Sequence, residues 1–282
     1  DSGVRLLRAA AIAVVVGFLA TFLILPLAVV FREALRHGWR AYVAAITEPE
    51  ALAAVRLTLC ATVAALLLNT VFGLFAAWCL GKHRFRGRNL LLSLIDLPYA
   101  VSPVVAGLLL VMLFGRHSWL GGILAQWGIE IIFAVPGIIL ATAFVTLPMI
   151  ARELIPIMEA QGTEEEEAAR LLGANGFQIF WHVTLPNIRW ALLYGIVLCT
   201  ARAMGEFGAV SVVSGHIRGS TTTLPLHVEI LYNEYRFSAA FAAASLLTIA
   251  ALVSLISKRV MERAYEQDRR PHKIQSRRKN TP

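Results

Sequence analysis

The chain has 282 residues, of which 57% are hydrophobic and 16% are charged, and it carries a formal net charge of +8. Soluble domains contain about a quarter charged residues, so this composition argues against an ordinary soluble fold. The sequence contains no G-x4-G-K-[ST] phosphate-binding loop, no nucleophile elbow and no metal-ligand spacing. We therefore expect neither an enzyme in its own right nor a metal protein. Three cysteines, Cys60, Cys79 and Cys199, lie in apolar segments without C-x-x-C spacing and favour simple packing.

Six apolar segments follow one another along the chain. They predict membrane-spanning helices over about 9–31, 57–81, 89–115, 131–153, 190–213 and 237–257. A helix needs about 20 apolar residues to cross the hydrocarbon core, and each backbone polar group must be satisfied inside the segment. The predicted fold class is an all-α membrane protein with six transmembrane helices. The first segment is too long for the apolar part of a signal peptide, so we expect it to be retained.

The basic residues indicate an orientation. The termini and the segments that follow an even number of spans carry 18 Lys and Arg, whereas the segments on the other side carry 7. Basic loops stay in the cytoplasm, which predicts that both termini are cytoplasmic. We expect one membrane domain over 1–260 and a basic cytoplasmic tail over 261–282 that contacts anionic lipid. The basic residues are not interleaved with aromatic ones, so no nucleic-acid partner is expected.

The third predicted span contains a carboxylate and two prolines. Asp96 is its only charged residue, and Pro98 and Pro103 follow within seven positions. Proline removes a backbone donor and bends or breaks a helix. We therefore expect this span to be interrupted, with Asp96 as a structural intramembrane charge.

The segment 161–186 predicts a helix–turn–helix between two spans. Thr163 is suited to cap the first helix, and Glu166 three residues later completes a capping-box pattern. Gly173 is expected to end this helix with a positive φ, and a second short helix is expected over 177–183. Glu164 and Glu165 are interpreted mainly as a solvated acidic face.

This segment resembles the EAA loop of ABC-importer permeases. The family pattern E-A-A-x3-G-x9-I-x-L-P is matched throughout except that Val183 replaces the isoleucine. The resemblance implies a type I ABC importer transmembrane domain whose cytoplasmic coupling helix docks into a groove on a separate ATPase. The residues that it assigns to this coupling are Glu167, Ala168, Ala169, Gly173, Leu185 and Pro186.

Four further blocks, 96–107, 184–195, 201–219 and 224–235, resemble sulfate/thiosulfate permeases of the CysW type, and the resemblance extends over about 10–260. It implies an ATP-driven importer in the bacterial inner membrane. The expected partners are a second similar permease subunit, two copies of an ATPase and a periplasmic sulfate/thiosulfate-binding protein. ATP and Mg would bind the ATPase, with no cofactor on this chain. The alternatives are a molybdate or tungstate permease and, in another class, an ion-driven transporter or channel that acts alone.

The fifth predicted span carries two charges, Arg202 and Glu206. They are four residues apart, so one helix would place them on the same face, within reach of each other. The structural interpretation is an ion pair, with Asp96 as a second acid. The functional interpretation places Arg202 on the anion path, because a guanidinium suits a tetrahedral oxyanion. Hydroxyl groups along that path would come from Ser102, Ser211 and Ser214.

Overall fold

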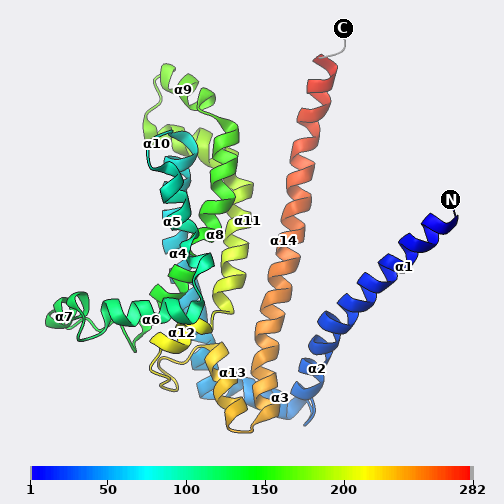
Figure 1. The fold of residues 1–282 in the computed structure, drawn as a ribbon, viewed down its shortest axis with the longest axis vertical. Coiled ribbons are helices and arrows are strands. Elements are labelled where there is room, and N and C mark those ends of the chain that lie inside the picture. Colours follow the sequence, from blue (N-terminus) through cyan, green and yellow to red (C-terminus); the bar gives the residue numbers. More distant parts are fainter. Residues whose placement is uncertain (1, 280–282) are drawn as a thin grey trace.

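The computed structural model describes residues 2–279, and the side chains of these residues except Ser2, Leu6 and 264–279. The predicted tail 261–282 therefore lies largely outside the described side chains. Within residues 2–279 the secondary structure is entirely helical (Figure 1). The helices are α1 Ser2–Leu19, α2 Leu25–Ala34, α3 Trp39–Thr47, α4 Pro49–Lys82, α5 Arg88–Ala100, α6 Pro103–Phe114, α7 Trp119–Gln126, α8 Val135–Gln161, α9 Glu164–Leu171, α10 Gly176–Ile179, α11 Leu185–Met204, α12 Gly208–Val213, α13 Leu224–Asn233 and α14 Phe237–Lys279, with π-helical turns η1 Ala20–Ile24 and η2 Phe180–Thr184.

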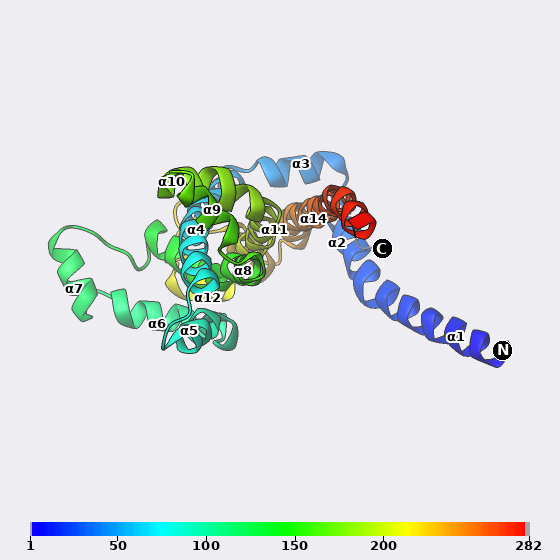
Figure 2. The same ribbon diagram turned by 90° about the horizontal axis from the view of Figure 1, so that it is seen from above.

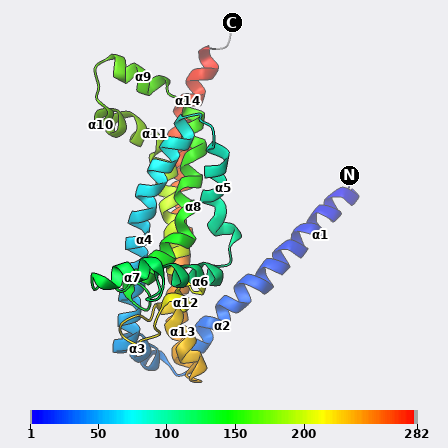
Figure 3. The ribbon, with the colours of Figure 1, turned by 60° about the vertical axis from the view of Figure 1, so that its left-hand side comes forward.

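Five helical segments of the described chain are long and apolar enough to cross a membrane. They are Gly3–Ala34, Pro49–Lys82, Val135–Gln161, Gly176–Met204 and Phe237–Arg263. A sixth span is obtained only if α5 and α6 are taken together, and these two helices meet at an angle of 108°. The expected all-helical class is confirmed, and the interruption expected near Pro98 and Pro103 is present. Figure 3 shows α6 and α7 running across the bundle rather than along it.

The fifth span differs from the expected range 190–213. Its helix begins far earlier, at Gly176, and ends at Met204. Gly205 and Glu206 then interrupt the chain before the short helix α12. The early start has a physical reason: α10, η2 and α11 follow one another without a break, and the π-helical turn η2 directly before Leu185 lets the helix continue past Pro186.

The centre of the bundle is the contact between α4 and α8. Glycines on α4 allow it: a Cβ on Gly73 would lie 2.7 Å from the Ile150 side chain, and one on Gly81 would lie 2.8 Å from Met158. Small residues let membrane helices approach closely. Close van der Waals packing matters because no hydrophobic effect drives helices together inside lipid. A buried polar tie adds to the contact, since the Asn69 amide donates to the Ala143 carbonyl at 3.0 Å and to Thr146 Oγ1 at 2.8 Å.

At the end of the bundle opposite α9, ion pairs fasten the segment that leads into α14. Arg218 bridges Glu50 at the start of α4 and Glu234 at the end of α13, and Arg236 pairs with Glu48 at 3.1 Å. Beneath them the His227 ring is buried, and this burial lowers the pKa of His227 below its ordinary value. The ring is therefore neutral near pH 7, so it packs as an uncharged group.

The first helical segment stands apart from the rest. Figures 1 and 2 show α1 running away from the bundle, and only α2 packs along α14. None of the most apolar window of Gly3–Ala34 is buried within the described chain. This apolar surface is left for lipid or another membrane subunit to cover.

The glycine contact yields a test of the core. Replacing Gly73 with Leu should force α4 away from α8, and such overpacking costs about 1–3 kcal/mol. We expect a lower thermal unfolding temperature of the detergent-solubilised protein. The matched control is Gly122→Leu on α7, where a side chain would meet nothing within 4 Å. Equal unfolding temperatures for the two variants would contradict the close α4–α8 contact.

Candidate coupling loop and intramembrane charges

The segment 161–186, here called the coupling loop, protrudes from one end of the bundle (Figure 1). It leaves α8 at Gly162, whose φ and ψ of 65° and −157° suit only glycine. Helix α9 follows and ends as expected at Gly173, which has a φ of 89°. The amide groups of Gly173 and Ala174 donate back to carbonyls of the last turn of α9 at 3.0 and 3.1 Å. The loop is therefore a stiff helix–turn–helix rather than a flexible connection.

The expected capping box at Thr163 is wrong. The Thr163 side chain makes no capping bond; its hydroxyl donates to Glu167 Oε1 at 2.7 Å. Glu166 is likewise turned away from the helix start, toward Thr184 and Lys82. A capping box does exist, at Asn175 and Gln178, where both hydrogen bonds are 2.9 Å. The spacing of Asn175 and Gln178 is that of a capping box, but the nearby Gly173 and Gly176 indicated only a turn.

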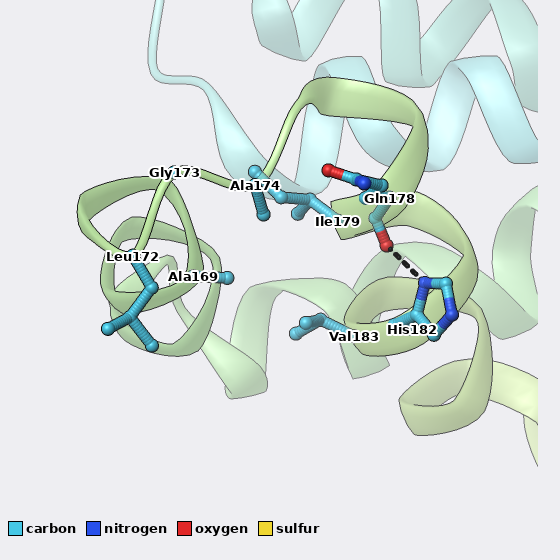
Figure 4. Close-up of a pocket in the computed structure, with 8 residues that line it drawn as sticks. All are labelled: Ala169, Leu172, Gly173, Ala174, Gln178, Ile179, His182 and Val183. Carbon is cyan, nitrogen blue, oxygen red and sulfur yellow. Dashed lines mark hydrogen bonds between the residues drawn. The ribbon is translucent and has the colours of Figure 1, made fainter.

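Helices α9 and α10 enclose a small open pocket of about 390 Å³. Figure 4 shows its lining: Ala169, Leu172, Gly173, Ala174, Gln178, Ile179, His182 and Val183. Leu172 in this lining and its neighbour Leu171 are 89% and 90% exposed, and Ala168 is exposed as well. The small side chains and exposed leucines form a protruding apolar surface to which another protein could bind.

The expected coupling residues separate into two groups. Ala168, Ala169 and Gly173 lie on the protruding part, together with Glu167, whose carboxylate holds Thr163. Leu185 and Pro186 lie at the base instead, in the first turn of α11, where Leu185 packs against the buried core. The pattern thus marks both the surface of the loop and the anchor that joins it to a span.

Several side chains fasten the base of the loop. The Gln161 amide donates to the Asn187 carbonyl at 3.0 Å, and the Asn187 amide donates to Glu165. Lys82, at the end of α4, lies 3.2 Å from Glu166 Oε1. Glu165 is therefore partly engaged and not simply a solvated acid, and Lys82 is a residue of this site that the sequence did not reveal.

Arg202 and Glu206 form the expected ion pair, with Nη1 and Oε2 2.6 Å apart. They do not share one helix, because α11 ends at Met204 and Glu206 lies in the break before α12. The other Glu206 oxygen accepts the amide of Ala209 at 3.0 Å, which satisfies the start of α12. The Glu206 side chain is 1% exposed and that of Arg202 is 36% exposed.

Asp96 is not the second acid of this pair. It pairs with Arg152 on α8 at 2.8 Å, and the Arg152 guanidinium lies over the Tyr99 ring at 5.3 Å. Arg152 stands at the end of the predicted span 131–153, and the sequence did not reveal it as the partner of Asp96. The helix continues past the predicted range to Gln161, although Pro156 lies within it.

The three serines lie near the helix breaks but differ in what they can offer. Ser102 directly precedes α6 and is exposed, and its side chain makes no capping bond. The Ser211 hydroxyl donates to the Gly208 carbonyl, and the buried Ser214 hydroxyl donates to the Thr221 carbonyl at 2.7 Å. The two breaks meet, because a Cβ on Gly208 would lie 2.9 Å from Pro103. Among the three serines, Ser102 is therefore the exposed one next to the helix break that contains Glu206.

The chain belongs to the family of binding-protein-dependent transport system inner membrane components, whose family model matches residues 69–267. It is 52% identical over 251 residues to the sulfate transport system permease protein CysW of Synechocystis sp., which covers 89% of this chain and 91% of that protein. The CysW protein of Escherichia coli K12 is 48% identical over 89% of this chain and 87% of its own length. The sulfate transport system permease protein CysT of Salmonella typhimurium is 39% identical over 85% of this chain and 87% of its own length.

The fold is also similar to solved structures. A bacterial ABC transporter for import of the acidic polysaccharide alginate matches with a TM-score of 0.77 at 16% identity, over 93% of this chain and 97% of that one. The alginate transporter in complex with its alginate pentasaccharide-bound periplasmic protein matches with a TM-score of 0.75 at 17% identity, over 92% and 95%. At these identities the likeness concerns the fold, which is that of an ABC importer permease.

The buried pair predicts an asymmetry between two variants. Arg202→Ala leaves a carboxylate buried without its partner, at a cost of roughly 3–5 kcal/mol, whereas Glu206→Ala leaves an arginine that is partly exposed. We expect Arg202→Ala to lower the yield of folded protein more than Glu206→Ala, measured by size-exclusion chromatography. Arg202→Met with Glu206→Gln should restore the yield, because Gln can still accept the Ala209 amide. A double variant no better than Arg202→Ala would contradict the structural interpretation.

Proposed function

We propose that this chain is a pore-forming permease subunit of an ATP-driven sulfate/thiosulfate importer. The supporting observation is the identity of 48–52% over most of the chain to permeases named for sulfate transport. In this proposal the chain translocates the anion that a periplasmic binding protein delivers across the bacterial inner membrane. The family is named for its dependence on a binding protein, which fits this arrangement.

The coupling loop is proposed to face the cytoplasm and to dock on an ATPase. Its exposed leucines and small pocket supply a surface that a partner groove could cover, and the excess of basic residues on the same side supports a cytoplasmic location. Both termini would then be cytoplasmic. ATP and Mg would bind two copies of that ATPase, and this chain would carry the resulting movement.

A second, homologous permease subunit is proposed to complete the pathway. The exposed apolar surface of α1 could pack on such a subunit, and CysT proteins show that a related but distinct permease class exists among the relatives. The anion path is proposed to pass Arg202 and Ser102 at the joined helix breaks. A charge at membrane depth normally faces a bundle interior or a water-filled cavity rather than lipid.

The docking role of the loop is tested at Gly173. A β-branched residue is strained at a φ of 89°, so Gly173→Val should disturb the turn while the membrane helices still insert. We expect the ATPase to be lost from the purified complex, or hydrolysis to stop driving uptake. The matched control is Gly176→Val, since Gly176 begins α10 without a positive φ and with free space around it. Normal ATP-dependent uptake by Gly173→Val would contradict the docking role.

The transport role predicts a dependence on partners. The single purified chain in liposomes should show no saturable sulfate flux, because it lacks an ATPase and half of the proposed pathway. The complete complex with its binding protein should take up labelled sulfate, and excess thiosulfate should compete more strongly than molybdate. Flux through the single chain would favour a channel or secondary transporter, and stronger competition by molybdate would favour a molybdate permease.

A further inference from the structure

The joint between α8 and α9 is a single glycine, Gly162. Its backbone occupies a region that is essentially restricted to glycine, and nothing lies within 4 Å of the position where a Cβ would be. Neither side-chain packing nor a helical backbone sets the angle between the two helices at this residue. Some other contact must therefore hold α9 at a fixed angle to the span.

Lys82 makes that contact from a third helix. Its ammonium group donates to the Gly162 carbonyl and lies 3.2 Å from Glu166 Oε1 in the first turn of α9. The same Glu166 oxygen accepts the Thr184 hydroxyl at 2.8 Å, next to the start of α11. Lys82 thus spans the glycine joint, and one carboxylate connects α9 to both α4 and α11.

The Lys82–Glu166 ion pair differs from the other charges of the loop in being buried. The side chains of Lys82 and Glu166 are 4% and 13% exposed. Exposed pairs contribute little, whereas a partner removed from a buried pair leaves a charge that is not compensated. A lysine at the end of a helix is also favoured by the helix dipole, and one at a membrane surface can contact lipid headgroups. Those roles require an accessible ammonium group, which Lys82 does not have.

The base of Lys82 is also firm. Gly73 and Gly81 hold α4 tightly against α8, so these two spans move together. A lysine at the end of α4 is therefore fixed relative to α8, and its bonds across Gly162 make α9 part of the same body. Without those bonds, α9 would be held only to the start of α11, through Thr184 and Asn187, and no longer to the α4–α8 pair.

We propose that Lys82 is a positioning residue that locks α9 to the α4–α8 pair, so that displacement of the coupling loop by the ATPase moves these spans. This inference rests on the proposed function of the loop. It predicts that loss of the lock leaves assembly and ATP hydrolysis intact but separates hydrolysis from transport.

The test uses the complete complex in proteoliposomes and measures the sulfate imported per ATP hydrolysed. The main variant is Lys82→Met with Glu166→Gln, which removes both charges and leaves neither one buried alone. We expect this ratio to fall about fivefold or more, the lower end of typical coupling between sites, while the ATPase still co-purifies. The single variant Lys82→Arg should keep most of the wild-type ratio, because arginine retains the positive charge and a side chain long enough to contact Glu166.

Two controls and one further variant decide between outcomes. Glu164→Gln alters an exposed acid of the same turn, and Arg86→Met alters an exposed cation near Lys82; both should keep the wild-type ratio. If this double variant does not assemble, Lys82→Leu with Glu166→Gln serves, since it also leaves no charge buried alone and Gln can still accept the Thr184 hydroxyl. A ratio within about twofold of wild type in the assembled variant, together with lost uptake by Gly173→Val, would overturn the role of Lys82 and leave the proposed function standing. Normal coupling in both variants would overturn the docking role of the loop as well, whereas a wild-type complex that imports no sulfate would overturn the proposed function.

Discussion

Hydrocarbon offers no hydrogen bonds, so each polar group at membrane depth needs a partner within the protein. The irregular parts of this fold follow from that constraint. Where α11 stops at Met204, the Glu206 carboxylate accepts the Ala209 amide and pairs with Arg202. Where α5 stops, α6 turns by 108° and packs against α12, so the two breaks cover each other. An interrupted span is tolerated here because a second interruption and a charge pair lie beside it.

The same constraint explains why the α4–α8 contact is so close. Apolar side chains gain little from leaving lipid for another apolar surface, so the association of helices depends on packing and on buried hydrogen bonds. Gly73 and Gly81 provide the first, and the Asn69 amide provides the second. The result is a rigid pair that extends from the far-end ion pairs of Glu48 and Glu50 to Lys82 at the coupling loop. A movement applied at one end of this pair is therefore felt along its length.

The sequence predicted features that depend on local chemistry and missed those that depend on contacts between distant segments. Hydropathy was enough for the all-helical class, and the turn at Gly173 followed from the conformational freedom of glycine. The Arg152–Asp96 pair was missed because its two residues are 56 positions apart and no local pattern connects them. Thr163 followed a capping pattern, yet Glu166 found a stronger partner in Lys82, on a helix that ends 84 positions earlier. A local rule is overridden when a tertiary contact offers a buried charge its counter-ion.

The coupling loop separates two tasks that a docking element must perform. Attachment needs apolar surface that becomes buried, and Leu171 and Leu172 each offer about 1.5–3 kcal/mol if a partner covers them completely. Transmission needs stiffness, which comes from the base: the Lys82–Glu166 pair, the Thr184 hydroxyl and the Asn187 amide. The residues that would bind the partner are therefore different from those that hold the loop to the spans. In the proposed docking arrangement, a substitution at the tip should change how much ATPase is bound, whereas one at the base should change how much transport each hydrolysed ATP drives.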